Sequence, residues 1–147
     1  MKVLQVTNNY PSTSFPIFGI FVKEQIDSLI NLGVKNDIIF INAREKGKRE
    51  YIRAYFRILF RIFTNRFDCI HCHHSFSGII FILTFGFLFN RSILSFQNPP
   101  SKEIGRFFFN FISVFFDIII LKNRVPGLYN SKIRILPNGV NVDFFQD

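Results

Sequence analysis

The sequence lacks several features that would place it in a specialised structural class. It contains no tryptophan and only two cysteines among 147 residues, which is too few cysteines for a disulfide-stapled scaffold. It also lacks the composition of a disordered chain, because 48% of its residues are hydrophobic and only 19% are charged. A chain of this length and composition can bury a core of its own, so we expect one globular domain or slightly more.

Long apolar segments are missing as well. The apolar stretch near the N-terminus ends at Asn8 and Asn9 after a few residues, whereas a secretory signal has an apolar core of roughly 7–15 residues. The longest nearly apolar run, residues 76–89, is shorter than the roughly 20 residues of a membrane-spanning helix. We therefore expect a cytoplasmic protein in which residues 76–89 form a buried helix.

Short apolar segments alternate with longer amphipathic ones along most of the chain. We expect strands at 2–7, 37–42, 67–73, 91–97, 117–121 and 132–136, helices at 19–32, 48–64, 76–89 and 102–115, and a helical turn near 125–130. The predicted strands are continuously apolar, which is typical of a parallel sheet covered on both faces. The pattern predicts an α/β fold, with a doubly wound, mostly parallel Rossmann-like sheet and helices on both faces.

In such sheets, ligands bind at the carboxyl ends of the strands, so the loops after the first, third and fourth strands are the candidate site. Gly19 begins the first helix, where a glycine permits close approach to the backbone and a helix N-terminus favours anions. An ordinary tight turn explains Gly19 equally well, and no G-x-G-x-x-G motif indicates a dinucleotide site. His73 and His74 end the third strand, and one of them is a candidate for substrate contact.

The cysteines and histidines of residues 68–74 raise two metal hypotheses. Cys69-x-x-Cys72-His73 matches the short pattern of c-type haem attachment, and the same side chains could bind zinc. In a strand, however, Cys69, His71 and His73 point to one face and Cys72 points to the other. The two thiols would not converge, so we expect no metal and no cofactor, and two cysteines that pack as small hydrophobic side chains.

Most of the formal net charge of +8 comes from residues 44–66, which contain eight basic and two acidic residues. Four arginines spaced by four form a basic stripe along the predicted helix, namely Arg49, Arg53, Arg57 and Arg61. An apolar stripe lies beside it, namely Ile52, Tyr55, Phe56, Leu59, Ile62 and Phe63. A basic amphipathic helix suits an anionic membrane surface. The alternative is an ordinary outer helix with its apolar stripe on the sheet, and the fold requires this at least in part. Nucleic-acid binding is not expected, because no recognised module accompanies the stripe.

Three segments, taken in order, match a known family pattern. Residues 3–11 and 18–26 are similar to a first strand, glycine loop and first helix. Residues 67–74, Phe-Asp-Cys-Ile-His-Cys-His-His, are similar to a "D-x-I-H-x-H" strand. Residues 135–145 are similar to an "I-P-N-G-V-D-x-x-x-F" passage that closes an N-terminal domain. On these segments the chain resembles the N-terminal half of bacterial family-four retaining glycosyltransferases, which have two facing Rossmann-like domains (the GT-B fold).

The resemblance implies transfer of a sugar from a nucleotide-sugar donor, with retention, to a membrane-associated lipid or polysaccharide acceptor. It also implies a role in lipopolysaccharide or capsule synthesis at the inner face of the cell membrane. Residues 1–136 would be the acceptor domain, and residues 137–147, with Asn138 and Gly139, would start the inter-domain connection. The donor-binding domain would be absent, so we expect the chain alone to be inactive. A non-catalytic remnant or membrane-surface module is the alternative.

The resemblance also suggests roles for individual residues, with two departures from the family pattern. Gly19 matches the loop that approaches the donor phosphates, but Phe18 stands where the family often has a second glycine. Gln97 stands where the family often has a histidine at the end of the fourth strand. Glutamine cannot act as a general base, so Gln97, with Asn98, would orient substrate by hydrogen bonds. No catalytic residue is assigned.

Overall fold

The computed structural model describes residues 1–128 and 130–137. Its strands are β1 (Lys2–Thr7), β2 (Lys35–Phe40), β3 (Cys69–His73), β4 (Ser92–Phe96), β5 (Ile118–Leu121) and β6 (Ile133–Ile135). Its helices are α1 (Ile20–Asn31), α2 (Ala43–Lys46), α3 (Arg49–Thr64), α4 (Ser75–Leu83), the 3-10 helix η1 (Gly86–Leu88), α5 (Pro100–Glu103) and α6 (Gly105–Ser113). The predicted connection, including Asn138 and Gly139, lies outside the described residues apart from residue 137.

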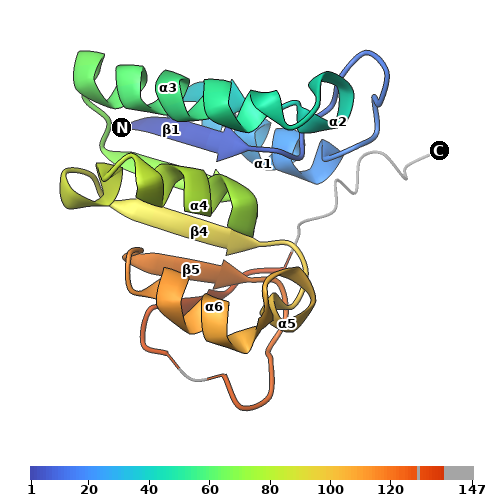
Figure 1. The fold of residues 1–147 in the computed structure, drawn as a ribbon, viewed down its shortest axis with the longest axis vertical. Coiled ribbons are helices and arrows are strands. Elements are labelled where there is room, and N and C mark those ends of the chain that lie inside the picture. Colours follow the sequence, from blue (N-terminus) through green and yellow to red (C-terminus); the bar gives the residue numbers. More distant parts are fainter. Residues whose placement is uncertain (129, 138–147) are drawn as a thin grey trace.

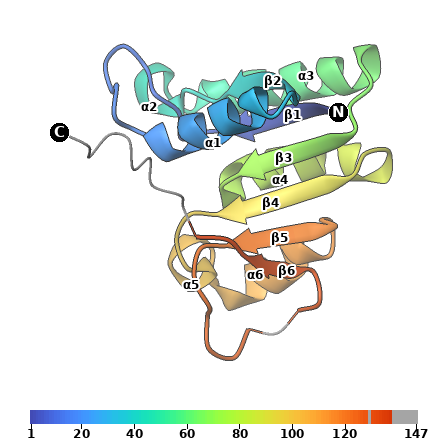
Figure 2. The ribbon, with the colours of Figure 1, turned by 180° about the vertical axis from the view of Figure 1, so that it is seen from behind.

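The strands form one parallel sheet in the order β2-β1-β3-β4-β5-β6. Helices α3, α4 and α6 cover one face, as Figure 1 shows, and α1 covers part of the opposite face, as the reverse view in Figure 2 shows. The sheet order reverses beside β1, because β2 lies on one side of it and β3 to β6 follow on the other. The predicted doubly wound, Rossmann-like α/β fold is therefore confirmed.

The strand register separates an apolar face from a partly polar one. Toward α3, α4 and α6, Leu4 pairs with Ile70, and Val6 pairs with Cys72; all four side chains are fully buried. The helices complete this core with residues such as Phe81, which is also fully buried. The opposite face of β1, β3 and β4 carries glutamine, histidine and serine side chains, which are described with the site.

Most predicted elements occur close to their expected positions, with local differences. β2 begins and ends two residues earlier than expected, and the short α2 was not expected. The side chain of Asn42 starts α2 by accepting a hydrogen bond from the Glu45 amide (3.3 Å). The expected helix at 76–89 is broken by Phe85, which adopts a left-handed φ of 56°, into α4 and η1. Where a helical turn was expected near 125–130, the described residues form a turn at 126–127, in which the Leu128 amide donates to the Val125 carbonyl (3.2 Å).

The burial of α3 also differs from expectation. The face toward the sheet contains Ala54 and Ile58, which are fully buried. Ile52, Phe56 and Phe63, which were expected to pack on the sheet at least in part, are 61–74% exposed. Apolar side chains occur around most of the circumference of this helix, so the sequence pattern could not distinguish the buried side from the exposed one.

Helix α4 is only partly buried. Phe81 lies in the core, but Phe76 and Leu83 are about half exposed, so the helix expected to be buried at 76–89 is buried along one side only. No helix in the described part of the chain combines the length and the apolar character that crossing a membrane requires.

Candidate functional site

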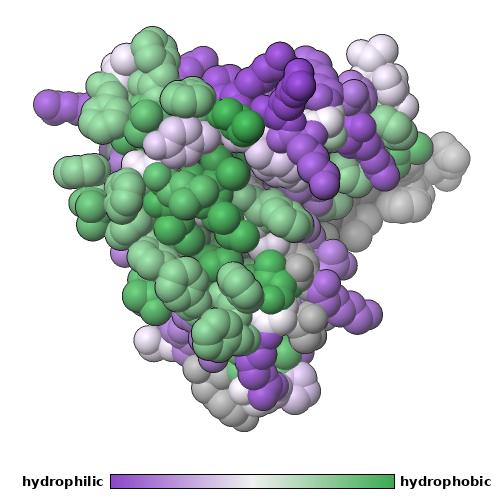
Figure 3. Space-filling model, viewed as in Figure 1, coloured by the Kyte–Doolittle hydropathy of each residue, from purple (hydrophilic) through white to green (hydrophobic). Residues whose placement is uncertain are grey.

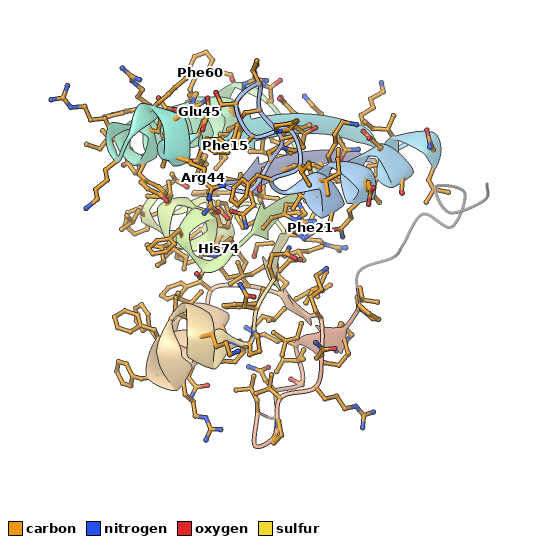
Figure 4. All side chains as sticks on the ribbon, turned by 90° about the vertical axis from the view of Figure 1, so that its right-hand side faces the viewer. Phe15, Phe21, Arg44, Glu45, Phe60 and His74 are labelled. Carbon is orange, nitrogen blue, oxygen red and sulfur yellow. The ribbon has the colours of Figure 1, made fainter. Side chains whose placement is uncertain are left out.

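The carboxyl ends of β1, β3 and β4 bring the candidate residues to one edge of the sheet. Figure 4 looks onto this edge and labels His74, which directly follows β3, together with Arg44 and Phe15. The His74 amide donates to the Ser95 carbonyl of β4 (2.8 Å), which fixes the β3 end beside the β4 end. The structure thus gathers the loops after the first, third and fourth strands, as the sequence predicted.

His74 has an unusual backbone conformation. Its φ of 103° and ψ of 147° lie in a region that residues with a side chain rarely adopt, at a cost on the order of 1–3 kcal/mol. Its ring Nδ1 accepts a hydrogen bond from the Phe76 amide (3.4 Å) at the start of α4. The His74 ring stacks on the Phe76 ring, with centroids 5.7 Å apart. In the neutral ring this arrangement leaves the proton on Nε2, which makes that atom a donor at the sheet edge.

His73, by contrast, is fully buried on the sheet face opposite the main core. Its Nε2 donates to Gln5 Oε1 (2.8 Å), and Gln5 Nε2 donates to Asn36 Oδ1 (2.7 Å). His71 Nε2 is 2.7 Å from Ser95 Oγ, and the two imidazole rings are 3.9 Å apart. His73 Nδ1 is buried with no hydrogen-bond partner among the described residues. This polar row links β2, β1, β3 and β4.

Both buried imidazoles are held in the neutral form. Burial, reinforced by the positive charge of Lys122, lowers the pKa of His71 to about 3. Burial, followed by His71 and Lys122, lowers the pKa of His73 well below its usual value. His73 is therefore a structural member of the row at neutral pH, and His74 is the histidine that lies within reach of a ligand.

Gly19 has a structural role within its own loop. It is buried, its φ is 73°, and a Cβ at this position would lie 2.3 Å from the backbone carbon of Asn9. No other residue fits this conformation at this distance. The Val22 amide donates a hydrogen bond to the Gly19 carbonyl (2.9 Å), so the residue that packs against the Asn9 backbone also begins α1.

A cation–π cluster holds the loop of residues 8–18, and no sequence pattern indicated it. The guanidinium carbon of Arg44 lies 4.6 Å from the Phe15 ring centroid and 4.2 Å from that of Phe18. Ser12 Oγ donates to Glu45 Oε1 (2.5 Å), which adds a second link between the loop and α2. Phe18, which departs from the family pattern, is therefore used to fasten this loop.

Gln97 and Asn98 follow β4 at the same edge. Gln97 is half-buried and Asn98 is exposed. Together with Lys122 they line a cavity of about 20 Å³. That volume is suited to a water molecule and is too small for a sugar. A wider groove of about 450 Å³, lined by residues including Leu121 and Leu128, lies beside it.

The predicted basic stripe is largely engaged in ion pairs. Arg53 and Arg57 both bind the buried carboxylate of Glu50, at 2.7 and 3.2 Å, and Arg61 pairs with Asp37 of β2. The hydrogen bond from Arg53, helped by the charge of Arg57, lowers the pKa of Glu50 below its usual value. Arg49 has no ion-pair partner among the described residues. The ion pairs of Arg53 and Arg57 with Glu50 lie within α3, whereas Arg61, through Asp37, and Arg57, through the Phe40 carbonyl (3.2 Å), fasten α3 to β2.

The cysteines lie on opposite faces of β3, as the strand interpretation predicted. Cys72 belongs to the main core, and burial raises the pKa of its thiol well above the usual value. Burial and the negative charge of Asp117 raise the pKa of Cys69 to about 11. Both thiols are protonated at neutral pH and are poor nucleophiles. Within residues 1–128 and 130–137 no group of three or more metal-ligating side chains is found.

Comparison with known proteins yields a likeness in fold. No family model matches the chain, and no curated protein matches it. A crystal structure of MurG from Acinetobacter baumannii aligns with 95% of this chain at a TM-score of 0.56 and 13% sequence identity. The alignment covers 46% of the MurG chain, so this chain spans about half the length of the protein it matches. At this identity the likeness establishes a shared fold.

Proposed function

We propose that this chain is the acceptor-binding half of a glycosyltransferase with two facing Rossmann-like domains. The observation that carries the proposal is the match of nearly the whole chain to about half of MurG, which is a glycosyltransferase of the GT-B fold. The segments at 3–11, 18–26, 67–74 and 135–145 support the same assignment independently, because they resemble the N-terminal half of such enzymes. This agreement does not favour the non-catalytic alternative.

In more detail, we propose transfer of a sugar, with retention, from a nucleotide-sugar donor to a lipid or polysaccharide acceptor at the inner face of the cell membrane. Family four is the assignment that the sequence segments support. The donor phosphates would approach the loop at Phe18 and Gly19. His74, Gln97 and Asn98 would contact the acceptor, since these three residues directly follow β3 and β4 at the carboxyl edge, where ligands of parallel sheets bind.

His74 is the residue on which this assignment depends most. Its costly backbone conformation is maintained at the carboxyl edge, and strained residues of this kind are concentrated at functional sites. Its stacking on Phe76 fixes the orientation of the imidazole ring. An imidazole can form hydrogen bonds with sugar hydroxyls and phosphate oxygens. His73, the last residue of β3, has a structural role in the sheet. Because its side chain is fully buried, it has no exposed surface for a ligand.

The acceptor assignment can be tested by NMR on the isotopically labelled chain. A detergent-solubilised glycolipid extract of the source cells is titrated in, with an extract of glycan-free phospholipids in the same detergent as the control. We expect shifts of the His74, Gln97 and Asn98 amides with the glycolipids alone. Equal shifts with both extracts, or shifts confined to the opposite edge near Asp68 and Arg91, would contradict acceptor binding.

We also propose that the chain by itself does not transfer sugar, since in a GT-B enzyme the reaction takes place in the cleft between the two domains. The purified chain is incubated with labelled nucleotide sugars and the glycolipid extract. Label remaining in the nucleotide sugar is the expected result. Label appearing in the lipid fraction would show that this chain is catalytically self-sufficient.

A further inference from the structure

The carboxyl edge of the sheet offers a polar ligand more than the hydrophobic side of the molecule does. The surface over α4 and α6 is largely hydrophobic, as Figure 3 shows in the view of Figure 1, and has few hydrogen-bonding groups for a sugar or a phosphate. At the carboxyl edge, Lys122 directly follows β5 and lines a cavity together with Gln97 and Asn98. Lys122 therefore lies beside two of the residues that we assign to the acceptor.

Lys122 is a half-buried cation that lacks a counter-ion. Within residues 1–128 and 130–137 its side chain has no hydrogen-bond or ion-pair partner, whereas Lys23 and Arg61, which are also half-buried, each pair with an aspartate. Burial lowers the pKa of Lys122 below its usual value. Removing a charge from water without a partner is unfavourable, so an anionic ligand would supply the counter-charge that the fold does not.

The residues around Lys122 do not neutralise its charge. Residues 97–128 include four basic residues against two acidic ones. One of the acidic residues, Asp117, lies at the opposite, amino edge of the sheet, where it accepts a hydrogen bond from the Ser92 amide (2.8 Å). The two buried imidazoles of the polar row are neutral and bring no negative charge. The end of β5 therefore favours the binding of an anion.

Lys122 is also well separated from the loop at Gly19. The sheet order places β3 and β4 between β1, which precedes that loop, and β5, which Lys122 follows. Neighbouring strands lie about 4.8 Å apart, so the ends of β1 and β5 are about 14 Å apart. The donor phosphates, which we expect at Gly19, are thus too distant to serve as the counter-ion of Lys122. The anionic group must then be carried by the acceptor.

We propose that Lys122 forms an anion subsite that binds a phosphate group of the acceptor, next to Gln97 and Asn98. The assignment of this phosphate to the acceptor rests on the proposed function. An ammonium is a compact point charge that binds phosphate, whereas the planar guanidinium of arginine is the better match for the two oxygens of a carboxylate. The substrate class is therefore a phosphate ester, either a lipid-linked phosphate or a soluble sugar phosphate.

Binding of inorganic phosphate to the isotopically labelled chain tests the subsite directly. The dissociation constant is measured by NMR from the shift of the Gln97 amide at constant ionic strength. The variant Lys122→Met removes the charge and keeps the length of the side chain, and Lys35→Met, at the exposed start of β2 on the amino edge, is the matched control. We expect the dissociation constant to rise about tenfold in Lys122→Met and to be unchanged in Lys35→Met. An equal dissociation constant in the wild type and in Lys122→Met, or tighter binding of acetate than of phosphate, would overturn the subsite.

Three further probes identify the molecule that carries the phosphate. They are polyprenyl phosphate in detergent, compared with uncharged polyprenol; glucose 1-phosphate, compared with glucose; and uridine diphosphate. Binding that depends on Lys122 identifies a lipid-linked acceptor with the first probe and a soluble one with the second, whereas such binding of uridine diphosphate alone would assign Lys122 to the donor and overturn the proposal. Glycolipid-induced shifts of the His74 amide that are unchanged in Lys122→Met would remove the subsite and leave the proposed function intact. Absence of those shifts in a chain that still binds phosphate through Lys122 would instead contradict the assignment to an acceptor.

Discussion

Acidification from about pH 7 to about pH 5 should destabilise this domain through His71 and His73. Both imidazoles are buried and neutral in the folded protein, with the pKa of His71 lowered to about 3 and that of His73 lowered well below its usual value. In the unfolded chain each histidine takes up a proton near pH 6.5. The unfolded state then binds more protons, so stability is full above this pH and falls steadily below it.

The size of the effect follows from the proton uptake. A histidine that stays neutral in the folded state and titrates near pH 6.5 in the unfolded state lowers the free energy of unfolding by about 2 kcal/mol as the pH falls from 7 to 5. His71 and His73 together should therefore lower it by about 4 kcal/mol. Because the whole stability of a domain is about 5–15 kcal/mol, this loss is a large part of it.

The assay is urea unfolding followed by circular dichroism across this pH range. In the double variant His71→Gln and His73→Gln, side-chain amides take the place of the imidazoles as hydrogen-bond partners of Ser95 and Gln5. The stability of this variant should depend much less on pH. A second readout uses the wild type alone, since the imidazole Cε1 proton shifts of the two buried rings should not follow the titration of an exposed histidine. Titration of either ring near pH 6.5 in the folded protein would show that this imidazole is not held in the neutral form by burial.

Three further predictions concern the loop and the helix beside the site. Gly19→Ala should lower the free energy of unfolding by about 2 kcal/mol or more, because it adds a clash with the Asn9 backbone to the strain of a positive φ. Gly33→Ala, at a similar φ but with open space around it, should cost only about 1 kcal/mol in the same urea titration. Glu50→Gln should cost about 1 kcal/mol at neutral pH, and this difference should be lost as the pH falls through the lowered pKa of Glu50, as thermal unfolding at several pH values would show. Arg44→Ala should speed amide hydrogen exchange in residues 12–18, because its contacts with two aromatic rings are lost. Unchanged exchange there would show that the cation–π cluster does not hold this loop.

Most strands could be located from sequence because they contain a short apolar run, although β2 also includes the polar residues Lys35 to Asp37 and so began earlier than predicted. Ile118 to Leu121 are four consecutive aliphatic residues, and they form β5 as expected. Helix ends were harder to predict, because they depend on single backbone conformations such as the positive φ of Phe85. The exposed side of α3 could not be predicted either, since Ile52 and Phe56 have the hydrophobicity of core residues but lie on the solvent side.

The edge of the sheet that carries the site could be predicted, but several of its contacts could not. Parallel topology places His74 and Gln97 at one edge once the strands are known. The row that contains His71 depends on the register between β3 and β4, which pairs His73 with Ser95 and which no short-range pattern specifies. The contact of Arg44 with Phe15 and Phe18 joins segments almost thirty residues apart, and its only signal was an arginine in a basic region.

Incorporation of labelled sugar into the lipid-linked glycans of source cells, with and without the gene for this chain, tests the proposed glycosyltransferase role most directly. We predict that deletion lowers incorporation into one glycolipid class, and that the wild-type gene restores it while a gene carrying His74→Ala with Gln97→Ala does not. Unchanged glycolipid labelling in the deletion strain would contradict a role in sugar transfer.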